Sequence, residues 1–209
     1  MIPVKVLAVR YLANASSALA KGLGAPKGYP SLAMLTTDCD DATYIALDAA
    51  TKAADVQVSY GRSFYAGATN ASTPNAGEVI GILAGPTPGA VRSGMEAALG
   101  TLQRIGFEEV GGVPYLAHTV ASVGSFLAKE AGVNVGSAVA YLIAPPLEGM
   151  YAMDAALKAA DVKLCKLYAP PSETNFGGGL LSGTQSACEA ACAAFAQSVA
   201  EVARMPIEG

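Results

Sequence analysis

The stretch Asp48-Ala-Ala-Thr-Lys-Ala-Ala-Asp-Val56 recurs 106 residues later as Asp154-Ala-Ala-Leu-Lys-Ala-Ala-Asp-Val162. At a similar spacing, Ser17-Ala-Leu-Ala-Lys21 matches Ser125-Phe-Leu-Ala-Lys129, and Leu83-Ala-Gly85 matches Leu181-Ser-Gly183. Three matching segments in the same order indicate a duplication, and the drift in their spacing indicates loops of unequal length. We therefore expect two homologous domains, residues 1–108 and 109–209.

A duplication of this kind predicts an assembly. Two copies are too few for a solenoid, which needs three or more. A fused pair of domains instead replaces two subunits of a symmetric ring. The hydrophobic fraction of 52% and the charged fraction of 14% support this interpretation, because so few charges leave too little polar surface to coat a monomer.

Each copy is expected to run strand, short helix, strand, helix, strand, strand, helix. This order mixes the two element types without strict alternation, so the fold class is α+β. Thr87 is expected to cap a helix that begins at Pro88. Asp40 or Asp41 is expected to cap the helix 42–54. In the first copy we expect strands at 4–11, 31–37, 56–60 and 78–84, and helices at 16–21, 42–54 and 88–105; the last helix of the chain is expected at 185–204.

The overall composition excludes several classes of protein. A net charge of −4 without a basic stripe argues against nucleic-acid binding. No segment reaches the roughly 18 uncharged apolar residues of a membrane span, so we expect no membrane partner. The high apolar content excludes a disordered chain.

Catalytic groups are scarce in this sequence. His118 is the only histidine, and no Ser-His-Asp order, phosphate loop or metal-binding cluster accompanies it. We therefore expect no enzyme activity, no cofactor and no metal, and a structural role for His118. The four cysteines, Cys39, Cys165, Cys188 and Cys192, are interpreted as small buried hydrophobic residues of a cytosolic protein rather than as disulfides.

Two long loops are predicted at equivalent places in the two copies, residues 62–77 and 168–179. Both are rich in small and polar residues, with isolated aromatic residues among them. Loops of this length in compact domains are usually functional or mobile. A ring would bring all copies of these loops to one axis.

Several separate motifs carry a family resemblance that covers nearly the whole chain. They are Asp38-Cys-Asp-Asp-Ala-Thr-Tyr44, Tyr60-Gly-Arg-Ser-Phe-Tyr-Ala-Gly67, Ala76-Gly-Glu-Val-Ile-Gly-Ile-Leu-Ala-Gly-Pro86, Ala144-Pro-Pro-Leu-Glu148 and Pro171-Ser-Glu-Thr-Asn175. Together they resemble the EutL-type tandem-domain shell proteins of ethanolamine-utilisation microcompartments.

The resemblance implies circularly permuted microcompartment domains, each a small, mainly antiparallel sheet with flanking helices. It implies a homotrimer that mimics a hexagon, tiles with other shell proteins in a cytoplasmic microcompartment shell, and has a gated central pore. It further implies a small acidic pore for metabolites such as ethanolamine, formed by Asp40, Asp41, Glu78, Phe107 and Thr184. The central pore loops would contain Phe64, Tyr65, Ala66, Gly67, Ala68, Thr69, Asn70, Asn175, Phe176, Gly177, Gly178 and Gly179.

Alternatives remain open at three points. The chain could belong to a microcompartment that does not process ethanolamine, or it could be a soluble protein that binds a small amine. Asp40 and Asp41 could serve only as helix-terminal charges, which are favoured at the first turn. The repeated helices with Lys52 and Lys158 could be ordinary exposed helices with i, i+4 charge pairs, or interface helices between tiled trimers.

Overall fold

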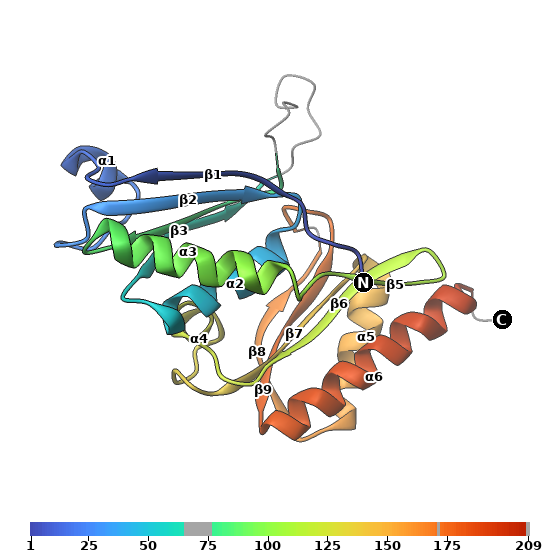
Figure 1. Ribbon diagram of the computed structural model, residues 1–209. Coiled ribbons are helices and arrows are strands. Elements are labelled where there is room, and N and C mark those ends of the chain that lie inside the picture. Colours follow the sequence, from blue (N-terminus) through green and yellow to red (C-terminus); the bar gives the residue numbers. More distant parts are fainter. Residues whose placement is uncertain (65–76, 171, 208–209) are drawn as a thin grey trace. The chain divides into compact units, whose positions relative to one another are not determined.

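The computed structural model describes residues 1–64, 77–170 and 172–207, which form two compact units (Figure 1). The first-repeat unit contains residues 3–105 together with the short segment 124–127. The second-repeat unit contains residues 1–2, 106–123 and 128–209. We describe each unit by itself.

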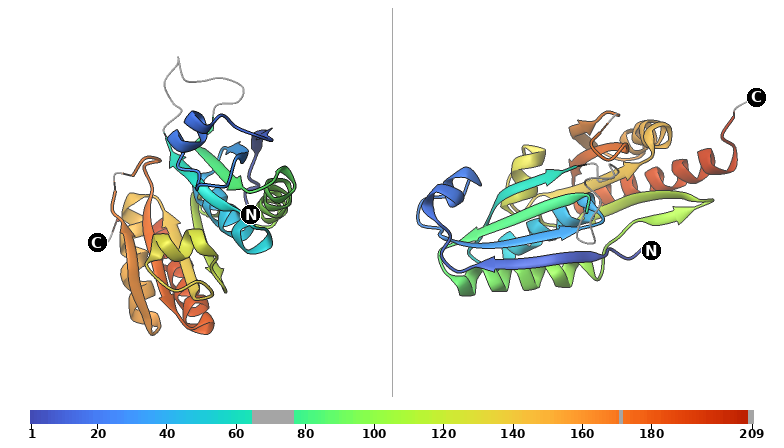
Figure 2. Two further views of the ribbon diagram at one scale, coloured as in Figure 1. Left: turned by 90° about the vertical axis from the view of Figure 1, so that its left-hand side faces the viewer. Right: turned by 90° about the horizontal axis from the view of Figure 1, so that it is seen from above.

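The first-repeat unit is an antiparallel sheet with two long helices on one face (Figures 1 and 2). The strand order is β1-β2-β4-β3. Helices α2 and α3 pack against each other; α2 also contacts β4 and β3, and α3 contacts β2 and β4. The bounds are β1 (Val6–Leu12), α1 (Ser17–Gly22), β2 (Ser31–Thr37), α2 (Asp40–Ala53), β3 (Gln57–Ser63), β4 (Val79–Gly85) and α3 (Pro88–Leu102).

Close packing of α2 on the sheet depends on one glycine in β4. A Cβ atom at Gly81 would lie 2.5 Å from Cδ1 of Leu47, which is fully buried on α2. Since real Cβ contacts essentially never come so close, a larger residue at position 81 would force the buried Leu47 side chain out of its present position. Apolar side chains of β2 and β4, such as Leu35 and Leu83, fill the remaining core.

The second-repeat unit has the same plan with one extra strand. Its strand order is β5-β6-β7-β9-β8, again antiparallel throughout. Helices α5 and α6 pack on this sheet around the fully buried Phe195 (Figure 1). The bounds are β5 (Glu108–Val110), β6 (Val113–Val120), α4 (Ser125–Ala131), β7 (Ala138–Ala144), α5 (Pro146–Ala159), β8 (Val162–Tyr168), β9 (Gly177–Gly183) and α6 (Gln185–Arg204).

Backbone details confirm the duplication. Gly24 and its counterpart Gly132 have φ angles of 73° and 64°, and Gly28 and Gly136 both have a φ of 90°. These left-handed values favour glycine, so matching glycines mark matching turns. The predicted α+β class and the element order of the first half are confirmed, whereas β5 in the second half was not expected.

Most predicted element bounds are within a few residues of those observed. Thr87 caps α3 as expected, since its hydroxyl oxygen accepts the N–H of Ala90 at 3.1 Å. That helix ends at Leu102 rather than at residue 105. The charge pairs expected on the repeated helices are also present, between Asp48 and Lys52 and between Asp154 and Lys158.

The cysteines are free thiols, and their burial differs from the prediction in part. Cys188 and Cys192 lie on one face of α6 and are buried in the core of the second-repeat unit, as expected. Cys39 and Cys165 are only partly buried, because Cys39 precedes a helix and Cys165 lies on β8, a strand without any fully buried residue.

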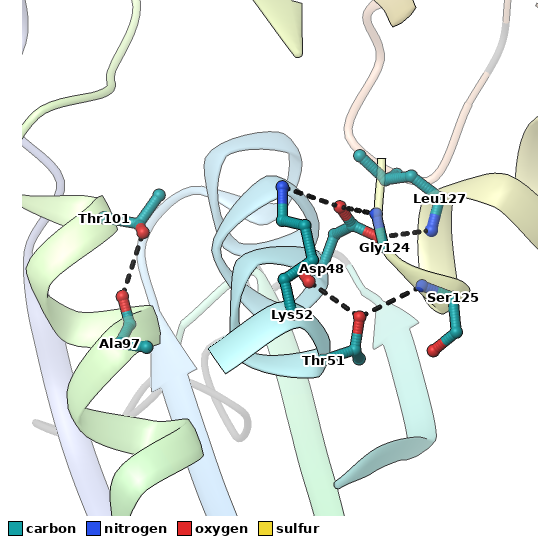
Figure 3. Close-up of polar contacts among 8 residues, drawn as sticks. All are labelled: Asp48, Thr51, Lys52, Ala97, Thr101, Gly124, Ser125 and Leu127. Carbon is teal, nitrogen blue, oxygen red and sulfur yellow. Dashed lines mark hydrogen bonds and ion pairs between the residues drawn. The ribbon is translucent and has the colours of Figure 1, made fainter. Parts of the chain in front are cut away.

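A buried carboxylate holds the segment 124–127 in the first-repeat unit (Figure 3). Asp48 on α2 has a fully buried side chain, which accepts the N–H groups of Gly124 at 2.7 Å and Leu127 at 2.9 Å. Position 124 must be a glycine, because a Cβ there would lie 2.7 Å from the Asp48 carbonyl oxygen. Charged hydrogen bonds of this kind are stronger than neutral ones, so this contact fixes where α4 begins.

We predict that Asp48→Asn lowers the free energy of unfolding by about 2–3 kcal/mol, because hydrogen bonds to a charged group contribute about 1.5–3 kcal/mol. The asparagine NH2 group would also face a backbone donor. Urea unfolding measures the loss. The matched control is Glu96→Gln, an exposed carboxylate on α3, which should change stability by less than about 0.5 kcal/mol. Equal effects of the two substitutions would contradict this role of Asp48.

Candidate functional site

Four acidic residues gather at one end of the first-repeat sheet. Thr37, the last residue of β2, pairs with Val79, the first residue of β4. Asp38 therefore follows one strand beside the point where Glu78 precedes its neighbour. Asp40 and Asp41 begin α2 at the same end. The structure thus brings together three of the residues predicted to form an acidic pore, Asp40, Asp41 and Glu78.

The predicted capping role of these aspartates is wrong. Cys39 is the N-cap of α2 and its side chain makes no capping bond, while Asp40 and Asp41 are the first two helical residues. Both are buried, and the Asp40 carboxylate accepts the N–H of Asp41 at 2.9 Å. Carboxylates in the first turn are favoured by the unpaired N–H groups and the helix dipole, so these side chains stay within the turn.

Burial and mutual repulsion shape the charge state of this cluster. Burial raises the pKa of Asp40, and hydrogen bonds, chiefly from the Ser63 hydroxyl, offset part of that rise. Burial also raises the pKa of Glu78, and the negative charges of Asp40 and Asp38 add to it. The ionised forms of both carboxylates are therefore less stable here than in water. A nearby cation would stabilise these ionised forms.

Ser63 is a site residue that the sequence reasoning missed. It ends β3, and besides its bond to Asp40 it shares a hydrogen bond of 2.7 Å with the Tyr44 hydroxyl on α2. A serine at a strand end carries no sequence signal of this role, because its partners come from another element. Only the pairing of β3 with β4 places it beside the start of α2.

Asp38 has a different environment from the other acidic residues. It is exposed, and its Oδ1 atom accepts the backbone N–H of Lys5 at 2.8 Å, just before β1. It contributes negative charge to the cluster, since it raises the pKa of Glu78, while its own hydrogen bond ties down the start of the chain.

Phe107 and Thr184 belong to the second-repeat unit, whereas the acidic cluster belongs to the first-repeat unit. The Phe107 ring contacts the Phe176 ring, with centroids 5.7 Å apart. Thr184 is the N-cap of α6, and its hydroxyl oxygen accepts the N–H of Ala187 at 3.1 Å. The hydroxyl of Thr184 therefore has a structural role in its own unit.

The two predicted pore loops are described to different extents. Of the first loop, Phe64 is described and is partly exposed, whereas Tyr65, Ala66, Gly67, Ala68, Thr69 and Asn70 lie outside the described residues. In the second loop, Asn175 has a left-handed φ of 64°, which is uncommon outside glycine.

The second loop is shorter than predicted. Gly177, Gly178 and Gly179 belong to strand β9 and pair with Leu142–Ala144 of β7, so placing them in a loop is wrong. Close packing explains the glycine at position 149 of α5, because a Cβ there would lie 2.6 Å from the Gly177 carbonyl oxygen. Helix and strand backbones approach closely here, and only small residues permit it.

Metal and membrane sites were also sought in the described part of the chain. Among residues 1–64, 77–170 and 172–207, no three His, Cys, Asp or Glu side chains are arranged to hold a metal ion. No helix within those ranges is both long and apolar enough to span a membrane.

Comparisons with known proteins identify the family. The BMC domain model matches residues 31–113. The microcompartment shell protein EutL of Clostridium perfringens is 56% identical, covering 99% of this chain and 97% of that protein. EutL of Escherichia coli is 45% identical, and the match covers 100% of this chain and 97% of that protein. The chain belongs to the EutL family of bacterial microcompartment shell proteins.

Solved structures agree with this assignment. The crystal structure of the ethanolamine utilization protein EutL from Leptotrichia buccalis superposes with a TM-score of 0.95 at 55% identity, covering 100% of this chain and 98% of that one. PduB, described as a trimeric bacterial microcompartment shell protein, has a TM-score of 0.80 at 20% identity, covering 96% and 89%, and so shares the fold. This member of the EutL family therefore consists of tandem BMC-like domains and is a component of the microcompartment shell.

We predict that Asp40→Asn stabilises the protein at pH 7 and that this gain disappears towards pH 3. The folded-state pKa of Asp40 is raised, so its contribution to stability is complete below the unfolded pKa and is lost as the pH rises through the folded pKa. Asparagine does not ionise, so the variant does not lose stability in this way as the pH rises. Urea unfolding of both proteins between pH 3 and 7 measures the difference between their free energies of unfolding. A difference in unfolding free energy that is constant with pH, or a variant less stable than the wild type at pH 7, would contradict the raised pKa of Asp40.

Proposed function

We propose that this EutL family member forms a homotrimer whose tandem domains, residues 1–108 and 109–209, make a pseudohexameric ring that tiles with other shell proteins. The duplication carries this proposal, because two homologous domains in one chain can occupy two successive positions of a sixfold ring. The description of PduB as a trimeric shell protein supports it. The low charged fraction of 14% supports extensive buried interfaces.

The acidic cluster at the start of α2 is proposed as a small pore that binds a small ammonium compound such as ethanolamine. Its support is the burial of Asp40 and Asp41 beside Glu78. An ammonium group 4 Å from one carboxylate gains about 4 kcal/mol at an effective dielectric constant of 20. A cation would also relieve the repulsion among the carboxylates. The Leptotrichia buccalis relative is described as an ethanolamine utilization protein, which favours this amine.

Phe107 and Thr184 are proposed to complete the small pore in the assembled shell protein. The acidic residues would supply charge, and these two would supply an apolar surface and a hydroxyl group. A hydroxyl near the carboxylates suits an amino alcohol, which carries an ammonium group and a hydroxyl of its own.

The central pore is proposed to be gated by the loops that follow β3 and β8. In the second loop, the contact between Phe176 and Phe107 is a small aromatic contact that a loop movement could break. A gate requires two conformations separated by only a few kcal/mol, and loops with few apolar contacts meet this requirement.

We predict that Asp41→Asn weakens ethanolamine binding by about 1–3 kcal/mol, the usual loss for a charged hydrogen-bond partner. Isothermal titration calorimetry with the full-length protein measures the change. Glu96→Gln on α3 removes the same charge from an exposed position and should leave binding unchanged. Absence of binding to the wild-type protein would contradict the proposed ligand. Tighter binding of a different small amine would indicate a microcompartment with another substrate.

We predict that Ala68→Cys, in a protein with Cys39 and Cys165 replaced by serine, is joined into covalent trimers by a three-armed maleimide. Three copies of residue 68 around one axis would place the three thiols within reach of one reagent. A denaturing gel would show a band of 63 kDa, three times the chain mass of 21.0 kDa. Glu201→Cys in the same background, an exposed position on α6, is the control. Equal crosslinking at the two positions would contradict the axial placement of the loop.

A further inference from the structure

Equivalent residues of the two repeats differ sharply in burial. Leu127 has 1% of its surface exposed, whereas its counterpart Leu19 has 46% exposed. The side chain of Asp48 is fully buried, whereas that of its counterpart Asp154 is 64% exposed. Both members of each pair lie in matching secondary structure. The surface that the segment 124–127 and α2 bury in the first-repeat unit is therefore present a second time and uncovered.

The uncovered copy shows a matching exchange of large and small side chains. In the first-repeat unit, Gly61 of β3 lies beside Phe126, and a Cβ built on that glycine would be 3.7 Å from the ring. The counterpart of Phe126 is Ala18, and the counterpart of Gly61 is Leu167, which is 48% exposed. In the first pairing the large Phe126 lies on the small Gly61. In the second, the small Ala18 would lie on the large Leu167. Cores tolerate substitutions that conserve total volume, so this exchange is what two versions of one interface require.

We propose that residues 16–19 of one chain dock against α5 and β8 of a second copy of this chain, as the segment 124–127 docks in the first-repeat unit. This inference rests on the proposed trimer and names the contact that closes it. Ala18 would lie against Leu167 of the second copy, and Leu19 would become buried like Leu127. The Asp154 carboxylate would face the chain at position 19, as Asp48 faces Leu127. Ser16 stands where the first contact has Gly124 and carries a Cβ, so the chain at position 16 would lie farther from α5 than Gly124 lies from α2.

Such an interface is heterologous, because the two contributing surfaces are different. Repeated contacts of this kind close into a ring only if the rotation per subunit allows it. Here Asp154 keeps its Lys158 partner just as Asp48 keeps Lys52, so no unpaired lysine would be buried. The proposed contact therefore combines apolar area, the Asp154 carboxylate and a size-matched pair, Ala18 of one chain and Leu167 of the other.

The size-matched pair gives a rescue experiment. We expect Ala18→Phe alone to raise the concentration for half dissociation of the trimer by about tenfold or more, because a ring cannot fit against Leu167. Leu167→Gly alone should also weaken the trimer, since it leaves a gap. The double variant recreates the Phe126–Gly61 pairing and should restore most of the affinity. Sedimentation across a dilution series measures all four proteins. Additive weakening in the double variant would overturn the proposed register.

A mixing experiment tests the two-sided character of the contact. Leu19→Arg blocks one surface and Asp154→Arg blocks the other, so each variant alone should sediment as a monomer. Both residues are exposed in the single chain, and far-ultraviolet circular dichroism should confirm that the variants fold. An equimolar mixture should form a dimer of 42 kDa, twice 21.0 kDa, because one intact surface of each kind remains. Glu96→Arg on α3 is the control and should sediment like the wild type.

The outcomes separate this inference from the trimer itself. If the wild-type protein sediments as a monomer, the proposed assembly is wrong. If the wild type is a trimer and both arginine variants remain trimers, the assembly stands and the docking surface proposed here is wrong. A mixture of variants that stays monomeric would show that the two substitutions do not block opposite sides of one contact.

Discussion

The buried carboxylate of Asp48 is the interaction on which the organisation of the first-repeat unit depends. It satisfies two backbone N–H groups of a segment that lies far away in the sequence. A buried charge without such partners would be very costly, so the helix α2, the glycine at position 124 and the beginning of α4 are coupled. Thr51 strengthens this coupling, because its hydroxyl accepts the N–H of Ser125 and donates to the Asp48 carbonyl oxygen.

A second constraint acts at the N-terminal end of α2, where burial of several carboxylates costs stability. Packing α2 on the sheet through Gly81 buries Asp40 and Asp41 beside Glu78. Hydrogen bonds such as that from Ser63, together with the helix dipole at the first turn, reduce the cost of this concentration of charge. Functional sites commonly retain destabilising features of this kind, which agrees with the proposed binding of a small cation. Helix α2 thus carries a stabilising carboxylate, Asp48, in its interior and an acidic cluster at its N-terminal end.

The duplication also explains why two nearly identical helices have different environments. The motif around Asp48 and the motif around Asp154 differ at one position. The first meets a neighbouring segment of its own chain, and the second does not. In the proposed ring, each chain would leave one such surface uncovered at each end of its domain pair, which agrees with this difference. The contact made by Asp48 lies within one chain, and the counterparts of its size-matched residues Phe126 and Gly61 are Ala18 and Leu167.

Repeated motifs, hydrophobic periodicity and capping residues such as Thr87 are local signals, and they predicted the duplication, the α+β class and most element bounds. The family was predicted from the resemblance of several sequence motifs. That resemblance also pointed to Asp40, Asp41 and Glu78. The tertiary structure decided that Cys39 rather than an aspartate caps α2, that Ser63 bonds to Asp40, and that Gly177–Gly179 form a strand. It also decided that Asp48 is buried whereas Asp154 is exposed. Burial and hydrogen bonding between distant segments depend on strand register and on close packing, and neither is encoded in the residues next to one another in the chain.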